Sequence, residues 1–94
     1  MKIGRQAAIY NKTMTLADTE YSQQVGPGVV KVLVQCRGTY DVKVAFKTGE
    51  SATNYLTLKA GSVYYEDAVD DAPMTLYFQC AQAGQVLEII GWIR

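Results

Sequence analysis

Apolar and polar residues alternate along most of this chain, as they do in β-strands that bury one face. Apolar residues nowhere recur at helical spacing over three turns, so no helix is expected beyond a single turn in the acidic loop of residues 67–73. The predicted strands are residues 7–10, 13–16, 21–25, 29–37, 41–47, 55–59, 63–66, 75–81 and 85–93. Short strands separated by turn residues predict an all-β fold, a small antiparallel β-sandwich resembling a jelly roll, with about eight strands.

The last two predicted strands are joined by Gln82-Ala83-Gly84 and are expected to pair as a hairpin. Residues 29–37 and 41–47 are expected to form another antiparallel hairpin, with Gly38-Thr39 at its turn. The residues predicted to face the core are Val30, Val32, Val34, Cys36, Val42, Val44, Phe46, Leu56, Leu58, Leu76, Phe78, Cys80, Leu87, Ile89 and Ile93. A jelly roll is favoured over an up-and-down barrel because irregular loops join strands of uneven length.

The last strand is apolar on both faces, so something must cover its second face. Val86, Ile90 and Trp92 are predicted to face away from the core, with Tyr77 beside them on the neighbouring strand. A bulge at Gly91 that turns Trp92 inward is the alternative.

The chain is divided into an N-terminal arm with a short strand, residues 1–12, and a β-sandwich domain, residues 13–94. A turn is predicted at Asn11-Lys12. The arm is a candidate cover for the apolar patch, either from its own chain or from a neighbouring copy. The residues predicted to lie at such an interface are Ile3, Arg5, Ile9, Tyr10, Tyr77, Ile90 and Trp92.

Composition bounds the function classes. The chain has 94 residues, of which 49% are hydrophobic and 19% charged, as expected of one small globular domain. Nine basic and nine acidic residues cancel, which argues against nucleic-acid binding. No apolar run reaches the about 20 residues of a membrane span. Histidine is absent, which removes the commonest general base and the commonest zinc ligand, so no catalytic residue, metal or cofactor is predicted.

Three groups of residues could carry chemistry, and each has a plainer interpretation. The acidic residues of 66–71 could bind a hard cation but fit no calcium loop, so a solvated turn is favoured. Cys36 and Cys80 could form a cross-sheet disulfide, but reduced and buried thiols are the expectation. Seven tyrosines could stack on sugars or bases, while packing and protein interfaces are favoured.

Several segments resemble, in content and order, small virion proteins of tailed bacteriophages. They are LADTEYS at 16–22, VLVQ at 32–35, DVKVAF at 41–46, YLTLKAG at 55–61, LYF at 76–78 and AGQVLEIIGW at 83–92. The motifs are patterns of strand and turn rather than catalytic signatures. The resemblance implies a β-sandwich that decorates the capsid or joins parts of the head and tail, without enzymatic activity or cofactor.

These expectations combine into a non-enzymatic virion structural protein, made in the host cytoplasm, that binds the major capsid protein or other virion proteins. A capsid decoration or cement protein is the first interpretation. A tail, collar or fibre-base subunit is the second, and a carbohydrate-binding β-sandwich module is the third. The apolar second face of the last strand predicts a homo-oligomer, with a trimer at a capsid threefold position favoured.

Overall fold

The computed structural model describes residues 6–66 and 73–93. Within these residues the chain forms eight β-strands and one turn of 3-10 helix, η1. Their bounds are β1 Gln6–Met14, β2 Tyr21–Val25, β3 Val29–Cys36, β4 Val42–Ala45, η1 Glu50–Ala52, β5 Leu56–Leu58, β6 Val63–Glu66, β7 Met74–Cys80 and β8 Gln85–Ile93. The all-β prediction is therefore confirmed. The single helical turn predicted within residues 67–73 falls almost entirely outside the described residues.

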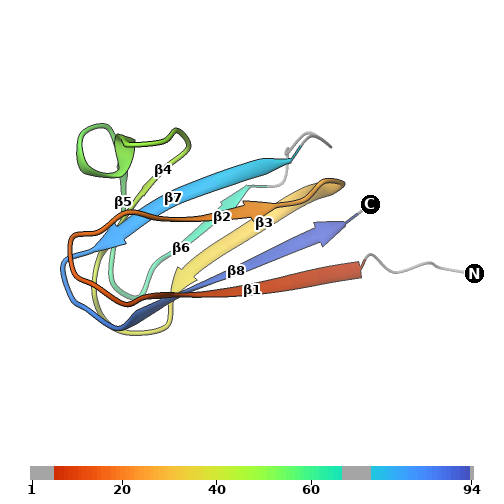
Figure 1. Ribbon diagram of the computed structural model, residues 1–94. Coiled ribbons are helices and arrows are strands. Elements are labelled where there is room, and N and C mark those ends of the chain that lie inside the picture. Colours follow the sequence, from red (N-terminus) through yellow and green to blue (C-terminus); the bar gives the residue numbers. More distant parts are fainter. Residues whose placement is uncertain (1–5, 67–72, 94) are drawn as a thin grey trace, which may run out of the picture.

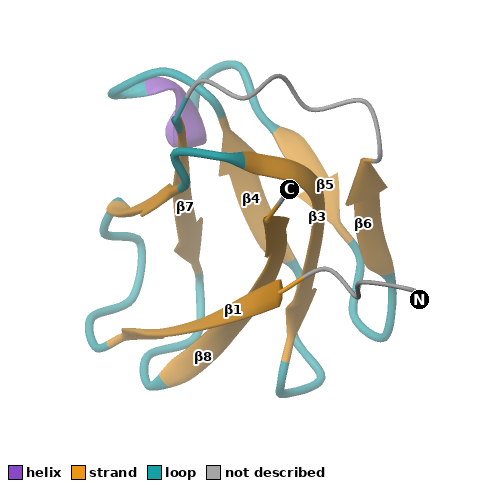
Figure 2. Ribbon diagram, turned by 90° about the vertical axis from the view of Figure 1, so that its right-hand side faces the viewer, coloured by secondary structure: helices purple, strands orange, loops and turns teal. Residues whose placement is uncertain are grey.

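The strands form two four-stranded antiparallel sheets (Figures 1 and 2). Sheet A has the order β1-β8-β3-β6, and sheet B has the order β2-β7-β4-β5. The first half of the chain pairs with the second half in nested fashion: β1 with β8, β2 with β7, β3 with β6 and β4 with β5. Successive pairs alternate between the sheets, as in a long hairpin rolled into a jelly roll. The jelly-roll-like sandwich is thus confirmed.

Both predicted hairpins are wrong. β7 lies in sheet B and β8 in sheet A, so the connection over residues 81–84 crosses from one sheet to the other. Gly84 supplies a φ of 82° in this turn. β3 and β4 are likewise in different sheets. Each pair of strands still faces a common core, but across the sandwich rather than side by side.

β1 is one continuous strand, not two short strands separated by a turn. All nine of its residues pair in register with β8, from Gln6 opposite Ile93 to Met14 opposite Gln85. The turn predicted at Asn11-Lys12 is wrong, because these residues pair with Glu88 and Leu87 of β8. Pairing with a long partner strand overrides the weak turn preference of this dipeptide. The boundary predicted at residue 12 therefore falls inside β1.

The core lies between the sheets and follows the predicted alternation in most strands. Leu76, Phe78 and Cys80 of β7 are buried against Leu87 and Ile89 of β8, as predicted. Val42, Val44 and Leu58 are buried as predicted, and Ile93 packs partly buried against the same core.

β3 departs from a regular alternation at its start. Its register with β8 shifts between Val29 and Lys31, and both Val29 and Val30 are buried. The irregularity adds Val29 to the core beside the predicted Val32 and Val34.

Phe46 and Leu56 were predicted to face the core, and both are exposed at 45%. β4 ends at Ala45, so Phe46 already belongs to the following loop. Leu56 opens β5, the edge strand of sheet B, where no further strand covers it. Alternation assigns a side to each residue, but not how far the opposite sheet extends over it.

Cys36 and Cys80 are both free thiols. Cys80 is buried as predicted, whereas Cys36, near the end of β3, is only partly buried. The two cysteines lie in different sheets.

Candidate interaction surface

A row of apolar side chains crosses the outer face of sheet A. Ile9, Ile90, Leu33 and Tyr65 lie directly opposite one another on β1, β8, β3 and β6. Directly opposed residues of antiparallel strands point to the same side, and these four point away from the core. Ile9 is 66% exposed and Tyr65 is 48% exposed, while Ile90 and Leu33 between them are half-buried. We call these four residues the apolar row.

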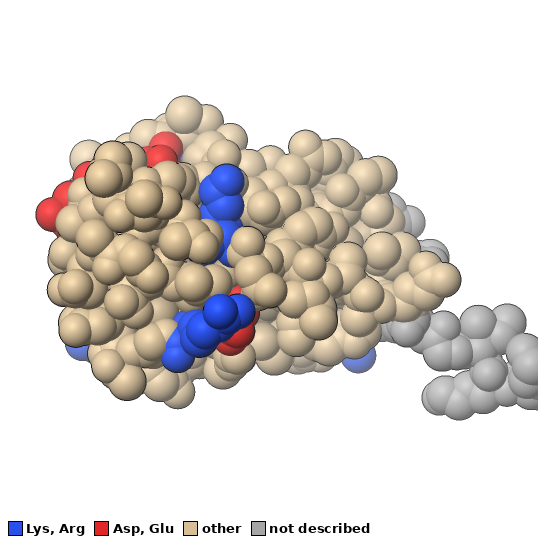
Figure 3. Space-filling model, turned by 60° about the horizontal axis from the view of Figure 1, so that its bottom comes forward, with Lys and Arg blue, Asp and Glu red and all other residues tan. Residues whose placement is uncertain are grey.

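The neighbouring rows add Trp92 on one side and a polar border on the other. Toward the carboxyl end of β8, Trp92 lies between Ala7 and Lys31. In the other direction Glu88 accepts hydrogen bonds of 2.9 Å from Arg37 Nε and from Gln35 Nε2. These hydrogen bonds, chiefly the one from Arg37, lower the pKa of Glu88, so its carboxylate stays charged at neutral pH. Figure 3 brings forward the side along which β1 lies in Figure 1, and this surface is largely uncharged.

The structure brings together three of the residues predicted from the sequence. Ile9, Ile90 and Trp92 share the outer face of sheet A. β8 pairs in register with β1 through Gly91, so a Gly91 bulge is wrong and Trp92 faces away from the core.

Tyr10 and Tyr77 lie elsewhere. Tyr10 is opposite Ile89 and packs against the core from the rim of the sandwich. Tyr77 is in sheet B and cannot lie beside Trp92, because the predicted β7–β8 hairpin does not exist. Ile3 and Arg5 lie outside the described residues.

Leu33 and Tyr65 were not predicted for this surface. Leu33 was visible in the sequence as an apolar residue among the polar positions of its strand, between Lys31 and Gln35. This apolar residue on a polar face could have identified Leu33 as part of the surface. Tyr65 joins the row only through the pairing of β3 with β6, which no local pattern reveals.

The outer face of sheet B is different, because the loop between β4 and β5 covers part of it. Ser51 of η1 is fully buried and accepts a 2.9 Å hydrogen bond from Gln79 Nε2. Its hydroxyl donates in turn to Glu20, whose carboxylate also accepts from the backbone N–H groups of Gly49 and Ser51. This network holds the loop on sheet B, so sheet A presents the more open face.

We expect Glu20→Gln to lower the free energy of unfolding by about 1–2 kcal/mol, because buried Ser51 loses a charged acceptor. The hydrogen bond from Ser51 is the main cause that lowers the pKa of Glu20 below its ordinary value of 4.5. A lowered folded-state pKa gives stability that is present above the unfolded pKa and is lost as the pH falls through the folded one. Urea unfolding at neutral and acidic pH should therefore show the variant and the parent converging in acid. Glu50→Gln is the control, since it removes a carboxylate from the same turn without touching these bonds. An equal loss in both variants would contradict the network's role.

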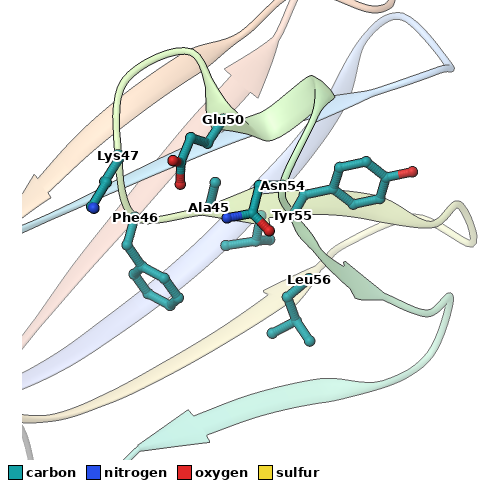
Figure 4. Close-up of a pocket in the computed structure, with 8 residues that line it drawn as sticks. Ala45, Phe46, Lys47, Glu50, Asn54, Tyr55 and Leu56 are labelled. Atoms are coloured by element: carbon teal, nitrogen blue, oxygen red, sulfur yellow. The ribbon is translucent and has the colours of Figure 1, made fainter.

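The same loop borders an open depression of about 420 Å³. Figure 4 shows the Phe46 ring and Leu56 on its apolar side, with the Glu50 carboxylate and the Asn54 amide on its polar side. Phe46 also lies near Tyr64, with ring centroids 6.1 Å apart. An aromatic wall beside hydrogen-bonding groups can take a small polar ligand with an apolar face.

Among residues 6–66 and 73–93, no three His, Cys, Asp or Glu side chains are grouped so that they could hold a metal ion. Five of the six residues in the acidic stretch 66–71, the alternative calcium site, lie outside those ranges. The described part of the chain contains no helix with the length and hydropathy that crossing a bilayer requires.

Comparison with known proteins supports the fold. No protein-family model matches the chain, and no curated protein matches it in sequence. Among solved structures it is similar to a de novo designed double-stranded β-helix determined by solution NMR. The TM-score is 0.54 at 16% sequence identity, over 93% of this chain and 97% of that chain. The chain thus has the eight-stranded architecture of the double-stranded β-helix.

Proposed function

We propose that this chain is a non-enzymatic virion structural protein of a tailed bacteriophage, a decoration protein that docks on the major capsid protein. The observation that carries the proposal is the apolar row across all four strands of sheet A. The sequence resemblance to phage virion proteins supports it. The jelly roll recurs in viral capsid proteins, although a fold does not by itself define a function.

The outer face of sheet A suits a protein partner better than a soluble ligand. A face of four strands, the longest of nine residues, covers on the order of 500 Å², so contact with an equal surface buries about 1,000 Å². That is the lower limit for a specific interface. Aliphatic and aromatic side chains at the centre with charged groups at the border match the usual anatomy of such interfaces.

A structural role also agrees with the available side-chain chemistry. The chain has no histidine, and its formal net charge is zero. Among the described carboxylates, Glu20 and Glu88 are engaged in hydrogen bonds that hold a loop and a sheet surface. We therefore propose neither a catalytic residue nor a cofactor, and partners that are virion proteins rather than nucleic acid or membrane.

The test is binding to capsids that lack the protein. We expect Tyr65→Asp to weaken binding by about 30-fold or more, because a charge replaces an exposed aromatic residue in the contact. Tyr55→Asp is the matched control, since Tyr55 is 41% exposed but borders β5 in the other sheet. Leu33→Asp should repeat the effect, with Leu56→Asp as its control. Each variant is first checked for a native far-ultraviolet spectrum.

The outcomes separate the rival functions. Binding to isolated tails, collars or fibre bases but not to capsids would move the protein to another part of the virion. Capsid binding that is equal in Tyr65→Asp, Leu33→Asp and their controls would contradict docking through sheet A.

The depression beside Phe46 favours a second candidate, a carbohydrate-binding module. Its aromatic wall could stack on a sugar ring, while Glu50 and Asn54 could bind hydroxyl groups. Glycan binding that is lost in Phe46→Ala and unchanged in Tyr65→Asp would favour this candidate over the first.

A further inference from the structure

The free edge of β1 differs from the other three sheet edges. The two sheets end in β1, β6, β2 and β5. β1 has nine residues, whereas β6 has four, β2 five and β5 three. β1 contains no proline and one charged residue, Lys12. Soluble proteins usually shorten, charge or interrupt their edge strands, because an open edge pairs readily with another chain. A long and regular edge strand is therefore expected to pair with a strand of another chain.

The hydrogen-bonding groups at this edge can be assigned. Arg37 N–H donates to the carbonyl of Val86, so Val86 directs its backbone groups toward β3. Direction alternates along an antiparallel strand, so Ile89 and Gly91 direct theirs toward β1. Their partners Tyr10 and Ala8 then bond to β8. The residues whose N–H and C=O groups are left at the free edge are Ala7, Ile9, Asn11 and Thr13.

These four residues share a second property, because all of them are exposed and belong to the outer face of sheet A. Ile9, at 66%, is the most exposed of the large apolar residues on the described surface. An incoming strand would both satisfy the free backbone groups and cover Ile9. Among the described strands, β1 pairs with β8 alone and forms one edge of sheet A, and Figure 1 shows it along the lower side of the molecule.

We infer that β1 pairs antiparallel with β1 of a second copy, about a twofold axis that passes beside Tyr10. This register uses all nine residues of the strand and places Ile9 opposite Asn11 of the second copy. Ala7 lies opposite Thr13 in the same way. The four residues with free groups in each strand then form the hydrogen-bonded pairs.

The register also suits the side chains on the other face. Lys12, which points toward the core side opposite Leu87, comes to lie opposite Ala8 of the second copy. The small alanine leaves room for the lysine stem, and the two Lys12 charges stay apart. The half-buried Tyr10 comes to lie opposite its own copy and gains an aromatic neighbour.

The result is one sheet of eight strands across two copies, and the apolar rows of both copies lie on the same side of it. A contact that uses the same strand twice is isologous and closes as a dimer, in place of the trimer expected from the sequence. The pairing does not require the proposed capsid partner, but it would double the surface offered to one.

The first measurement uses the unmodified chain. We expect light scattering to show a dimer that dissociates on dilution. Amide hydrogen exchange followed by NMR should show slow exchange at Ile9 and Asn11 in the dimer and fast exchange in the monomer. A chain that stays monomeric at high concentration, with these amides exchanging fast, would overturn the inference.

The second measurement removes one edge donor. Asn11→Pro deletes an N–H that points away from β8, so the fold should survive while the dimer dissociation constant rises about 30-fold or more. Asn11→Ala keeps the N–H and should leave the dimer intact. A dimer that is unchanged in Asn11→Pro would place the contact elsewhere and would equally overturn the inference.

The β1 edge pairing and the capsid docking through sheet A can be refuted by different outcomes. Tyr65 lies three strands away from the β1 edge, so Tyr65→Asp should weaken capsid binding and leave the dimer intact. A monomer that still binds capsids through Tyr65 refutes the edge pairing alone. A dimer without affinity for capsids refutes the docking alone.

Discussion

Phe78→Ala is expected to lower the free energy of unfolding by about 3–5 kcal/mol, as the loss of a fully buried aromatic side chain usually does. Phe78 is 0% exposed and lies at the centre of sheet B, opposite Tyr21 on one side and Val44 on the other. The cavity would open between two sheets that β-ladders hold at a fixed spacing, so the surroundings can collapse little. Stability of this size is a large fraction of what a small domain has, about 5–15 kcal/mol.

The chain contains its own control, because it has two phenylalanines. Phe46 is 45% exposed in the loop after β4. We expect Phe46→Ala to cost less than about 1 kcal/mol. Urea unfolding followed by Trp92 fluorescence measures both variants. Equal losses would mean that Phe46 faces the core, as the alternation of its segment predicts, and would contradict the arrangement described above.

Gly91→Val is expected to destabilise the protein by about 2–3 kcal/mol through overpacking. Gly91 is buried on the core side of β8, and a Cβ atom there would lie 3.0 Å from Val25 Cγ1 and 3.1 Å from Val29 Cγ2. These methyl groups belong to fully buried side chains on two different strands, so they have little room to retreat. The larger valine cannot be accommodated without moving the sheets apart.

Gly38→Ala is the matched control for this prediction. A Cβ atom at Gly38 would come even closer to a neighbouring atom, Oε1 of Gln85. That neighbour is the end of a flexible side chain that can turn away, so we expect a change below about 0.5 kcal/mol. Val29→Ala added to Gly91→Val should recover part of the loss, measured by thermal unfolding. No recovery in the double variant would show that backbone strain, not crowding, causes the effect.

The alternation of apolar and polar residues predicts which side of a strand is buried, but not which strands pair. Alternation in residues 75–81 and 85–93 identified the buried sides of β7 and β8, which supply Leu76, Phe78, Cys80, Leu87 and Ile89 to the core. It could not identify their partners, because a strand buries the same face whether its neighbour lies beside it or across the core. The predicted hairpins failed for this reason. The prediction that Phe46 faces the core was wrong, because the side that a residue faces does not tell where the opposite sheet ends.

Only part of the candidate surface could be predicted from the sequence, because local patterns do not reveal which strands pair. Ile90 and Trp92 follow from a strand that is apolar on both faces, and the structure places Ile9 beside them. Tyr77 was predicted for this surface because β7 and β8 were expected to form a hairpin, and that hairpin does not form. Tyr65 could not be found, because its place in the apolar row depends on the pairing of β3 with β6, which is non-local.

The nested pairing of the strands has a consequence for how the chain folds. β4 and β5 are the closest pair along the sequence, and each further pair lies outside the one before it. Folding that starts at the β4–β5 turn and proceeds outward needs only a short loop closure at each step, although the final contacts are distant in sequence. β1 and β8 then join last. Because β8 is made after the other described strands, β1 leaves the ribosome well before its partner strand has been synthesised.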